Sequence, residues 1–338
     1  MPHTPGGQIR RRAFVLGAAA GAGAWTHDEW ALFKTRFLAP DGRVVDTGNG
    51  GISHSEGQGW ALLAAMRSDD RDAFDRILRW TRTELRRPGD HLTAWKFRPG
   101  LGVEDTNNAS DGDIFIGASL IEAGRRWGDP RLTAQGIDIA RDILRLLVRR
   151  TGALTVLLPG ARGFEREGFV VLNPSYYAFP GLRVLAGALP DPRWIPLVAD
   201  GLALLRAARF GRWGLPPDWL AVSRRDGGLS LPHAWPPRFS YDAVRVPLYL
   251  AWAGLGDEPA CRAAAAFWSD PRHRELPAWT DLVTDAVSPY AATAGIAAVA
   301  GLVTRGEVPP GSIVAAADDY YGAALGLLTR MAWRDRTR

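Results

Sequence analysis

From residue 54 to the C-terminal tail, apolar residues recur at spacings of three and four, and proline and glycine interrupt the pattern. This spacing places apolar side chains on one face of a helix, so it predicts a succession of amphipathic helices. Several begin with a capping aspartate followed by proline, as at Asp129 and Asp191. The predicted helices span residues 55–68, 71–85, 111–127, 130–150, 174–188, 192–209, 241–253, 259–268, 289–303 and 312–333.

Strand signals are few. Residues 153–158 and 168–171 are expected to form a small β-hairpin around Pro159-Gly160. The helices come in pairs across short connections, which favours an all-α toroid or solenoid. No linker rich in proline and serine divides the chain, so residues 25–338 are predicted to form a single domain.

Residues 1–24 have the pattern of an export signal. Arg10, Arg11 and Arg12 precede a short apolar stretch that ends in small residues at Ala24. The arginine pair followed by Phe14 and Leu16 is typical of a twin-arginine signal peptide; a disordered basic tail is the alternative. No later stretch approaches the roughly 18 apolar residues of a membrane span. We therefore expect a periplasmic or secreted protein without a membrane span.

A net charge of +5 and 14 tryptophans suggest nucleic-acid binding at first sight. The excess positive charge, however, lies in the leader and in the tail from Arg330 to Arg338, and the other arginines are scattered among acids. Nucleic acid is therefore not an expected partner. One cysteine and six histidines provide little material for a zinc site, so neither a metal nor another cofactor is expected.

Three carboxylates stand at the starts of predicted helices. Ser53 and Glu56 have the spacing of a capping box, but glycines at 57 and 59 could instead let a polymer approach the backbone. Asp111 could be only a helix cap, and its Asx-rich loop also resembles a calcium loop that lacks the required glutamate. Asp242 could be a cap that pairs with Arg245 three residues later. Taken singly, none of these motifs identifies a function.

Together the motifs resemble glycoside hydrolase family 8. The segment 109–127, Ala-Ser-Asp-Gly-Asp-x-x-Ile-x-x-Ser-Leu-Ile-x-Ala-x-x-x-Trp, is similar to the family signature, with Gly117 where the family prefers alanine. The motifs at 55–58, 94–96, 173–177 and 241–245 follow in the family's order along essentially the whole mature chain. The resemblance implies an (α/α)6 barrel, here with short β-hairpin insertions, whose acidic cleft lies at the N-termini of the inner helices.

The resemblance also implies roles. Glu56 matches the general acid, Asp242 the general base, and Asp111 the aspartate that holds the sugar at the cleavage point of an inverting enzyme. Inversion requires two carboxyls roughly 6.5–9.5 Å apart. Helix N-termini would lower all three pKa values. We therefore expect burial and a nearby anion such as Asp111 to keep Glu56 protonated.

Aromatic rings stack on the flat faces of sugars. By the resemblance, Trp95, Tyr176 and Tyr241 line the cleft, and Arg245 is a polar partner near the base. Three further tryptophans are candidates for the same role, although core packing is the better expectation for each. They are Trp60, Trp219 and Trp235.

The resemblance is strongest to periplasmic endoglucanases that accompany bacterial cellulose synthases. It therefore implies a monomeric, inverting endo-β-1,4-glucanase acting on cellulose or a related β-glucan chain, with the cellulose synthase complex as a possible partner. Hydrolysis of chitosan or xylan on the same fold is the first alternative. A non-catalytic glycan-binding protein, a polysaccharide lyase and a glycoside phosphorylase are the others, because fold alone does not fix function.

Overall fold

The computed structural model describes residues 21–337, with side chains from residue 29 onward. Twelve α-helices alternate between an outer and an inner position over this range. The outer helices are α1 (Gly21–Phe37), α3 (Arg71–Glu84), α5 (Pro130–Leu146), α7 (Trp194–Ala207), α9 (Pro259–Trp268) and α11 (Ile313–Ala316). The inner helices are α2 (Ser55–Arg67), α4 (Ser110–Trp127), α6 (Phe179–Ala188), α8 (Arg245–Trp252), α10 (Ala294–Arg305) and α12 (Tyr320–Arg336).

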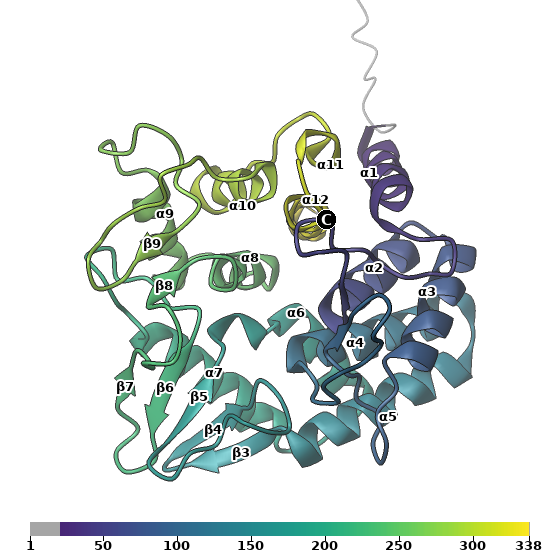
Figure 1. The fold of residues 1–338 in the computed structure, drawn as a ribbon, viewed down its shortest axis with the longest axis horizontal. Helices are drawn as coiled ribbons and strands as arrows, with labels where there is room; N and C mark the ends of the chain where they lie inside the picture. Colours follow the sequence, from purple (N-terminus) through teal and green to yellow (C-terminus); the bar gives the residue numbers. More distant parts are fainter. Residues whose placement is uncertain (1–20, 338) are drawn as a thin grey trace, which may run out of the picture.

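The six inner helices form a closed ring (Figure 1). Each packs against the next in chain order, and α12 returns to contact α2. Helix α2 is buried on every side from Gly57 to Met66, as an inner helix must be, whereas α3 buries only one face. The all-α prediction and the (α/α)6 barrel are confirmed.

The first and last parts of the chain are joined at the ring closure. The buried Glu29 carboxylate of α1 accepts hydrogen bonds from the Ile313 and Val314 amides, at 2.9 and 3.0 Å, and from the Ser312 hydroxyl at 2.8 Å. Arg330 of α12 lies 3.5 Å from the same carboxylate. The closing contacts therefore link residues almost 300 positions apart in sequence.

Most predicted helices are present, but some boundaries differ for local reasons. The expected helix 130–150 ends at Leu146, because the chain then enters strand β3 (Val148–Thr151). The expected helix 174–188 is a 3-10 turn, η1 (Pro174–Tyr176), followed by α6. The expected helix 312–333 is divided into α11 and α12. Helix α12 is capped by the Asp319 carboxylate, which accepts a hydrogen bond from the Gly322 amide at 2.8 Å.

The predicted hairpin between 153–158 and 168–171 is wrong. Strand β4 (Leu154–Leu157) pairs back onto β3 across a tight turn at Gly152, whose φ of +58° suits glycine. Strand β5 (Phe169–Leu172) instead pairs with the distant β6 (Leu220–Ser223), and β7 (Leu229–Ser230) completes that sheet. Two further pairs join β1 (Ser53–His54) to β2 (Lys96–Phe97) and β8 (Arg238–Phe239) to β9 (Thr280–Asp281).

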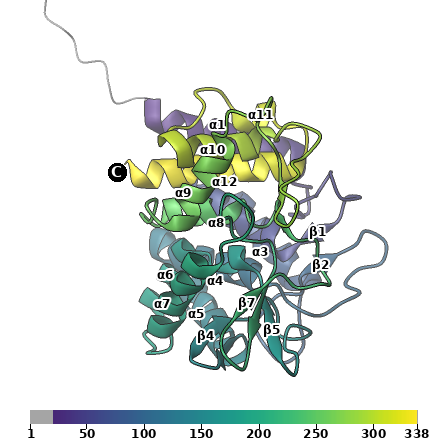
Figure 2. The same cartoon turned by 90° about the vertical axis from the view of Figure 1, so that its left-hand side faces the viewer.

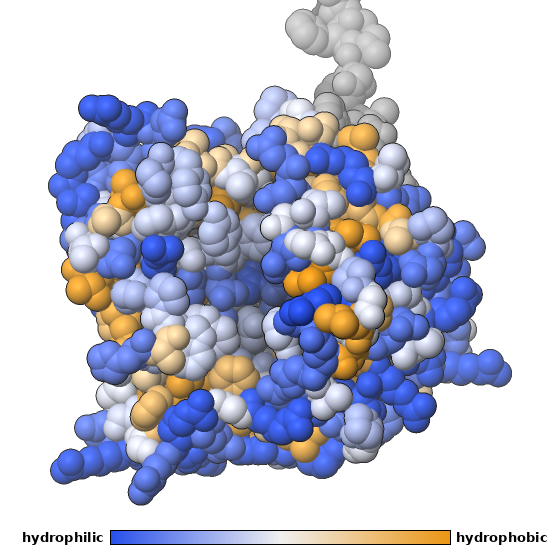
Figure 3. All heavy atoms as spheres, in the orientation of Figure 1, coloured by the Kyte–Doolittle hydropathy of each residue, from blue (hydrophilic) through white to orange (hydrophobic). Residues whose placement is uncertain are grey.

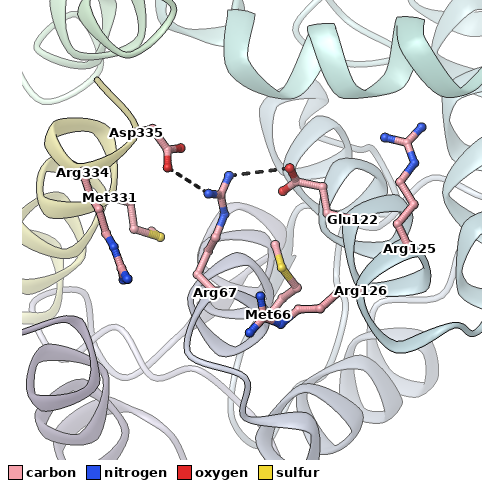
Figure 4. Close-up of a pocket in the computed structure, with 8 residues that line it drawn as sticks. All are labelled: Met66, Arg67, Glu122, Arg125, Arg126, Met331, Arg334 and Asp335. Atoms are coloured by element: carbon pink, nitrogen blue, oxygen red, sulfur yellow. Dashed lines mark hydrogen bonds and ion pairs between the residues drawn. The ribbon is translucent and has the colours of Figure 1, made fainter. Parts of the chain in front are cut away.

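The two ends of the ring differ. Strands and long loops gather at one end, on the right of Figure 2. At the opposite end, where helices α2, α4 and α12 finish, Arg67 lies 3.6 Å from Glu122 and 2.9 Å from Asp335 (Figure 4). These ion pairs tie three inner helices together beside a cavity of about 430 Å³. In the described part of the chain, every helix is too short or too polar to traverse a lipid bilayer.

Candidate active site

Glu56 and Asp111 occupy the first turns of the adjacent inner helices α2 and α4. The expected capping box at Ser53 and Glu56 is not formed. His54 caps α2 instead, because its Nδ1 accepts the Gly57 amide at 3.2 Å. The Ser53 hydroxyl donates to the Val44 carbonyl. The Glu56 side chain is therefore free to reach into the ring.

The glycines of these motifs serve helix packing. A Cβ at Gly112 would lie 2.4 Å from the Ser55 hydroxyl and 2.8 Å from the Glu56 amide. A Cβ at Gly57 would lie 2.4 Å from the Tyr320 hydroxyl. The interpretation of glycines 57 and 59 as an approach path for a polymer is therefore wrong. They let α2, α4 and α12 come close together at the end that holds the carboxylates.

A single guanidinium joins all three predicted carboxylates. Nη1 of Arg245 pairs with Glu56 and lies 3.1 Å from Asp111, while Nη2 lies 2.6 Å from Asp242. The Arg245 side chain is 1% exposed and Asp111 is fully buried, whereas Glu56 and Asp242 are 16% and 32% exposed. The structure thus brings together residues that lie up to 189 positions apart in sequence.

Asp242 differs from the other two in its local structure. The predicted helix 241–253 begins only at Arg245, so Asp242 lies in the turn before α8 rather than in its first helical turn. On its other side is the buried pair Asn173 and Ser175. The Asn173 side-chain oxygen accepts the Ser175 amide at 3.0 Å, and Nη2 of Arg245 donates to the Ser175 hydroxyl at 3.0 Å.

The pKa values of the three carboxyls follow from burial around one positive charge. Burial and the nearby Glu56 charge raise the pKa of Asp111 well above its ordinary value. Burial also raises the pKa of Asp242, against the effect of Arg245. For Glu56 burial is the largest influence, but Arg245 and hydrogen bonding outweigh it and lower its pKa. One guanidinium cannot balance three negative charges, and Asp111, the most deeply buried of the three carboxyls, hydrogen-bonds to Glu56 and is the one whose pKa is raised most strongly.

These directions correct two expectations. Burial outweighs the helix N-terminus at Asp111, so a helix dipole does not lower all three pKa values. The lowered pKa of Glu56 also contradicts the expectation that burial keeps this residue protonated. Both Glu56 and Asp111 pair with Arg245, but Asp111 is fully buried beside the Glu56 charge, and its pKa is therefore the raised one.

The predicted aromatic residues lie around this cluster. Tyr176 has its ring 5.8 Å from the Arg245 guanidinium carbon. Trp95 is half-buried, donates from its indole nitrogen to Asp105 at 3.0 Å, and adjoins the start of α2 because its carbonyl accepts the Ser55 amide. Tyr241 is 40% exposed, and its ring packs edge-on against Tyr321 at 5.7 Å.

The three additional tryptophans differ in burial: one lies in the core and two are partly accessible. Trp60 is 1% exposed and belongs to the core, with its ring 5.6 Å from Arg245. Trp219 and Trp235 are half-buried and stack on each other at 5.1 Å, and Trp219 also contacts Tyr176 at 6.3 Å. They form an aromatic row that extends from Tyr176.

Sequence reasoning missed several residues at this site. Asp218 carries no motif of its own, and Ser175 lies within the 173–177 motif but was given no role. Trp279 and Tyr290 are linked by a 3.0 Å hydrogen bond, and Tyr290 lies 3.3 Å from the Tyr241 hydroxyl. Tyr320 and Tyr321 open α12 at the same end of the ring as Glu56. This pair of adjacent aromatic residues at a helix start was the sequence feature that could have pointed to the site.

Figure 3 looks onto this end of the ring and shows a central hollow whose floor is hydrophilic. Two partly exposed carboxyls, a fixed cation and surrounding aromatic rings suit an extended neutral polymer. The described residues contain no group of three metal-ligating side chains placed to bind an ion. Asp113, which belongs to the segment with calcium-like spacing, lies in the first turn of α4 and accepts hydrogen bonds from the Thr93 amide and the Asn108 side-chain nitrogen at 2.7 and 2.8 Å.

Comparison with known proteins places this geometry in a family context. A model of glycosyl hydrolases family 8 matches residues 9–336. The chain is 45% identical over 314 residues to a "probable endoglucanase" of Novacetimonas hansenii, covering 91% of each chain. It is 39% identical over 287 residues to an endoglucanase of Cellulomonas uda, covering 84% of this chain and 79% of that one. The structure of endo-beta-1,4-glucanase CMCax from Acetobacter xylinum matches with a TM-score of 0.89 at 44% identity, covering 94% and 100%.

The close approach of α2 and α4 predicts the effect of Gly112→Ala. Its new methyl group would push the Ser55 and Glu56 backbone outward, so we expect a loss of about 1–3 kcal/mol in unfolding free energy, together with reduced turnover. Gly187→Ala is the control, because its methyl group would meet nothing within 4 Å in α6. Thermal or urea unfolding with parallel assays measures both. Equal stability of the two variants would contradict the packing role of Gly112.

Proposed function

The chain belongs to glycosyl hydrolase family 8, and from this premise we propose that Glu56 and Asp242 are the acid and base of an inverting endo-β-1,4-glucanase. The protein is a glycoside hydrolase of the endoglucanase type. The observation that carries the residue assignment is the convergence of three distant carboxyls on Arg245. Because one chain provides the whole site, we propose that it acts as a monomer.

Glu56 supplies the proton to the leaving oxygen. We infer that Asp111, whose pKa is raised by burial and by the Glu56 charge, stores the proton required for acid catalysis. Because the two carboxyls are hydrogen-bonded, this proton can pass to Glu56 across that bond. Glu56 is the more exposed of the two and so the better placed to reach the glycosidic oxygen.

Asp242 activates the water. It is 32% exposed, which gives solvent access, and it contacts a different guanidinium nitrogen from Glu56. The two carboxyls thus lie on different nitrogens of one guanidinium, and we propose that the attacking water binds on the Asp242 side of the sugar, opposite the acid. Ionised Asp242 accepts a proton from that water as the oxygen attacks the anomeric carbon.

The aromatic residues bind the glucan. Trp95, Tyr176 and Tyr241 have partly accessible rings around the carboxyl cluster, and Trp219 and Trp235 continue the row. Neutral glucose units fit such a surface, since their C–H faces stack on rings. Cellulose or a mixed-linkage β-glucan is therefore the proposed substrate, and chitosan and xylan are the alternatives that a substrate panel distinguishes.

Glu56→Gln and Asp242→Asn test the assignment. Each removes one proton-transfer group at nearly constant volume, so turnover on carboxymethylcellulose should fall on the order of 10³-fold. NMR of cello-oligosaccharide hydrolysis should show the α-anomer as the first product of the wild type. Near wild-type turnover of either variant would refute its role, and a β-anomer product would refute inversion.

The raised pKa values of Asp242 and Asp111 predict a shifted pH profile. Activity should fail at low pH when Asp242 gains a proton, above the ordinary range of an aspartate. It should fail at high pH when the Glu56–Asp111 pair loses its shared proton. Asp111→Asn cannot hold that proton, so the alkaline limb of kcat/KM should move to lower pH. An unmoved limb would contradict the shared proton; Asp200→Asn, outside the site, is the control.

We also propose that the protein is exported and takes part in cellulose biosynthesis, in association with a cellulose synthase complex. The twin-arginine-type pattern in residues 1–24, which lies largely outside the described residues, supports export. Similarity to the proteins of Novacetimonas hansenii and Acetobacter xylinum supports the biosynthetic role.

Cell fractionation and gene deletion test this proposal. Activity should appear in the periplasm or medium, and replacing Arg11 and Arg12 by lysine should retain it inside the cell. Deletion should change cellulose yield, and the wild-type gene but not Glu56→Gln should restore it. An unchanged yield would exclude the biosynthetic role and leave the hydrolytic function standing.

A further inference from the structure

Asp218 is a buried carboxylate that sequence reasoning did not identify. It lies two residues before strand β6 and is 8% exposed. Its Oδ1 accepts the Ser240 amide at 2.9 Å and the Ala243 amide at 2.7 Å, and its Oδ2 accepts the Ser240 hydroxyl. Every side-chain hydrogen bond that the structure gives Asp218 therefore goes to the segment that carries Asp242.

These bonds fix the backbone on both sides of Asp242. Ser240 lies two residues before it and Ala243 one residue after it, and each donates its amide to the same oxygen atom. Asp242 itself precedes helix α8, and within its turn the Val244 amide donates to the Ser240 carbonyl and the Arg245 amide to the Asp242 carbonyl, each at 3.0 Å. These bonds are local, whereas Asp218 ties both ends of the turn to a distant part of the chain.

The scaffold of Asp218 also reaches the opposite wall of the site. Strand β6, which follows it, pairs with β5 in the register Leu172↔Leu220. Asn173 comes directly after β5 and leads to Ser175, which accepts from Arg245. One small sheet thus holds the turn that carries Asp242 and the turn that faces it.

We propose that Asp218 is a positioning residue for the general base, holding the 240–243 turn so that the Asp242 carboxyl stays in line for water activation. This inference rests on the proposed role of Asp242. Asp218 does not touch the reacting atoms, so it acts only through the two amides and the hydroxyl. Because a displacement near 1 Å can cost about 10²-fold in rate, a carboxyl placed this way has a large effect on turnover.

Hydrogen bonding is separable from charge at this position. Burial, with the nearby Asp242 charge, raises the pKa of Asp218 to about 7, so the charge is not a fixed requirement. An asparagine can make the same bonds, because its oxygen accepts the two amides and its nitrogen donates to the Ser240 hydroxyl. A glutamate keeps the charge and the acceptors but displaces them by one methylene.

Asp218→Asn and Asp218→Glu therefore form the decisive pair, assayed on cellotetraose with unfolding temperatures measured alongside. We expect Asp218→Asn to retain kcat within about threefold. Asp218→Glu should lose about 10²-fold in kcat with an unchanged KM. Asp200→Ala is the structural control, since it removes a carboxylate that accepts the Thr155 amide at 2.7 Å away from the site. It should lower the unfolding temperature and leave kcat unchanged.

Each other outcome overturns the inference. Retained turnover of Asp218→Glu would show that the position of the turn is unimportant. A large loss of turnover in Asp218→Asn, with full turnover in Asp218→Glu, would assign the effect to charge. If Asp218→Glu does not fold, Asp218→Ala and Ser240→Ala are measured instead. The greater loss of kcat is expected for Asp218→Ala. Activity of Asp242→Asn would instead refute the proposed function, so the two failures are distinguishable.

Discussion

The pairing of one buried arginine with three carboxyls is the constraint around which the site is built. Arg245 can be buried only because Glu56, Asp111 and Asp242 surround it, and the carboxyls can be close only because it lies between them. The imbalance of charge raises the pKa of the most buried carboxyl, Asp111. The stability of the buried cluster and the proposed chemistry therefore depend on the same four side chains.

The ring supplies this cluster by bringing helix starts together. Gly112 allows α4 to approach the backbone of α2 within a distance that a larger residue would prevent, and Gly57 leaves room for the Tyr320 hydroxyl of α12. Ion pairs around Arg67 join the same three helices at the other end. The interior is consequently rigid, while the loops and short strands that shape the cleft lie outside it (Figure 2).

Apolar periodicity and capping residues predicted most helices, because those signals are local; α9 was placed correctly at Pro259–Trp268. The predicted strand pairing was wrong, because β5 pairs with β6 about 50 residues later and no local sequence feature specifies that partner. The family resemblance selected residues that the structure brings together around Arg245. It could not reveal Asp218, a lone aspartate between proline and tryptophan whose importance arises only when residues 240 and 243 fold onto it.

The junction between Glu29 and residues 312–314 has a consequence for how the protein is made. Helix α12 is the last of the described helices in chain order, yet it completes the ring against both α1 and α2. A nascent chain therefore carries Glu56, Asp111, Asp242 and Arg245 before the ring can close around them, and contacts of such sequence separation form slowly. The four side chains are enclosed by a complete ring only once α12 has been synthesised and has met α1 and α2.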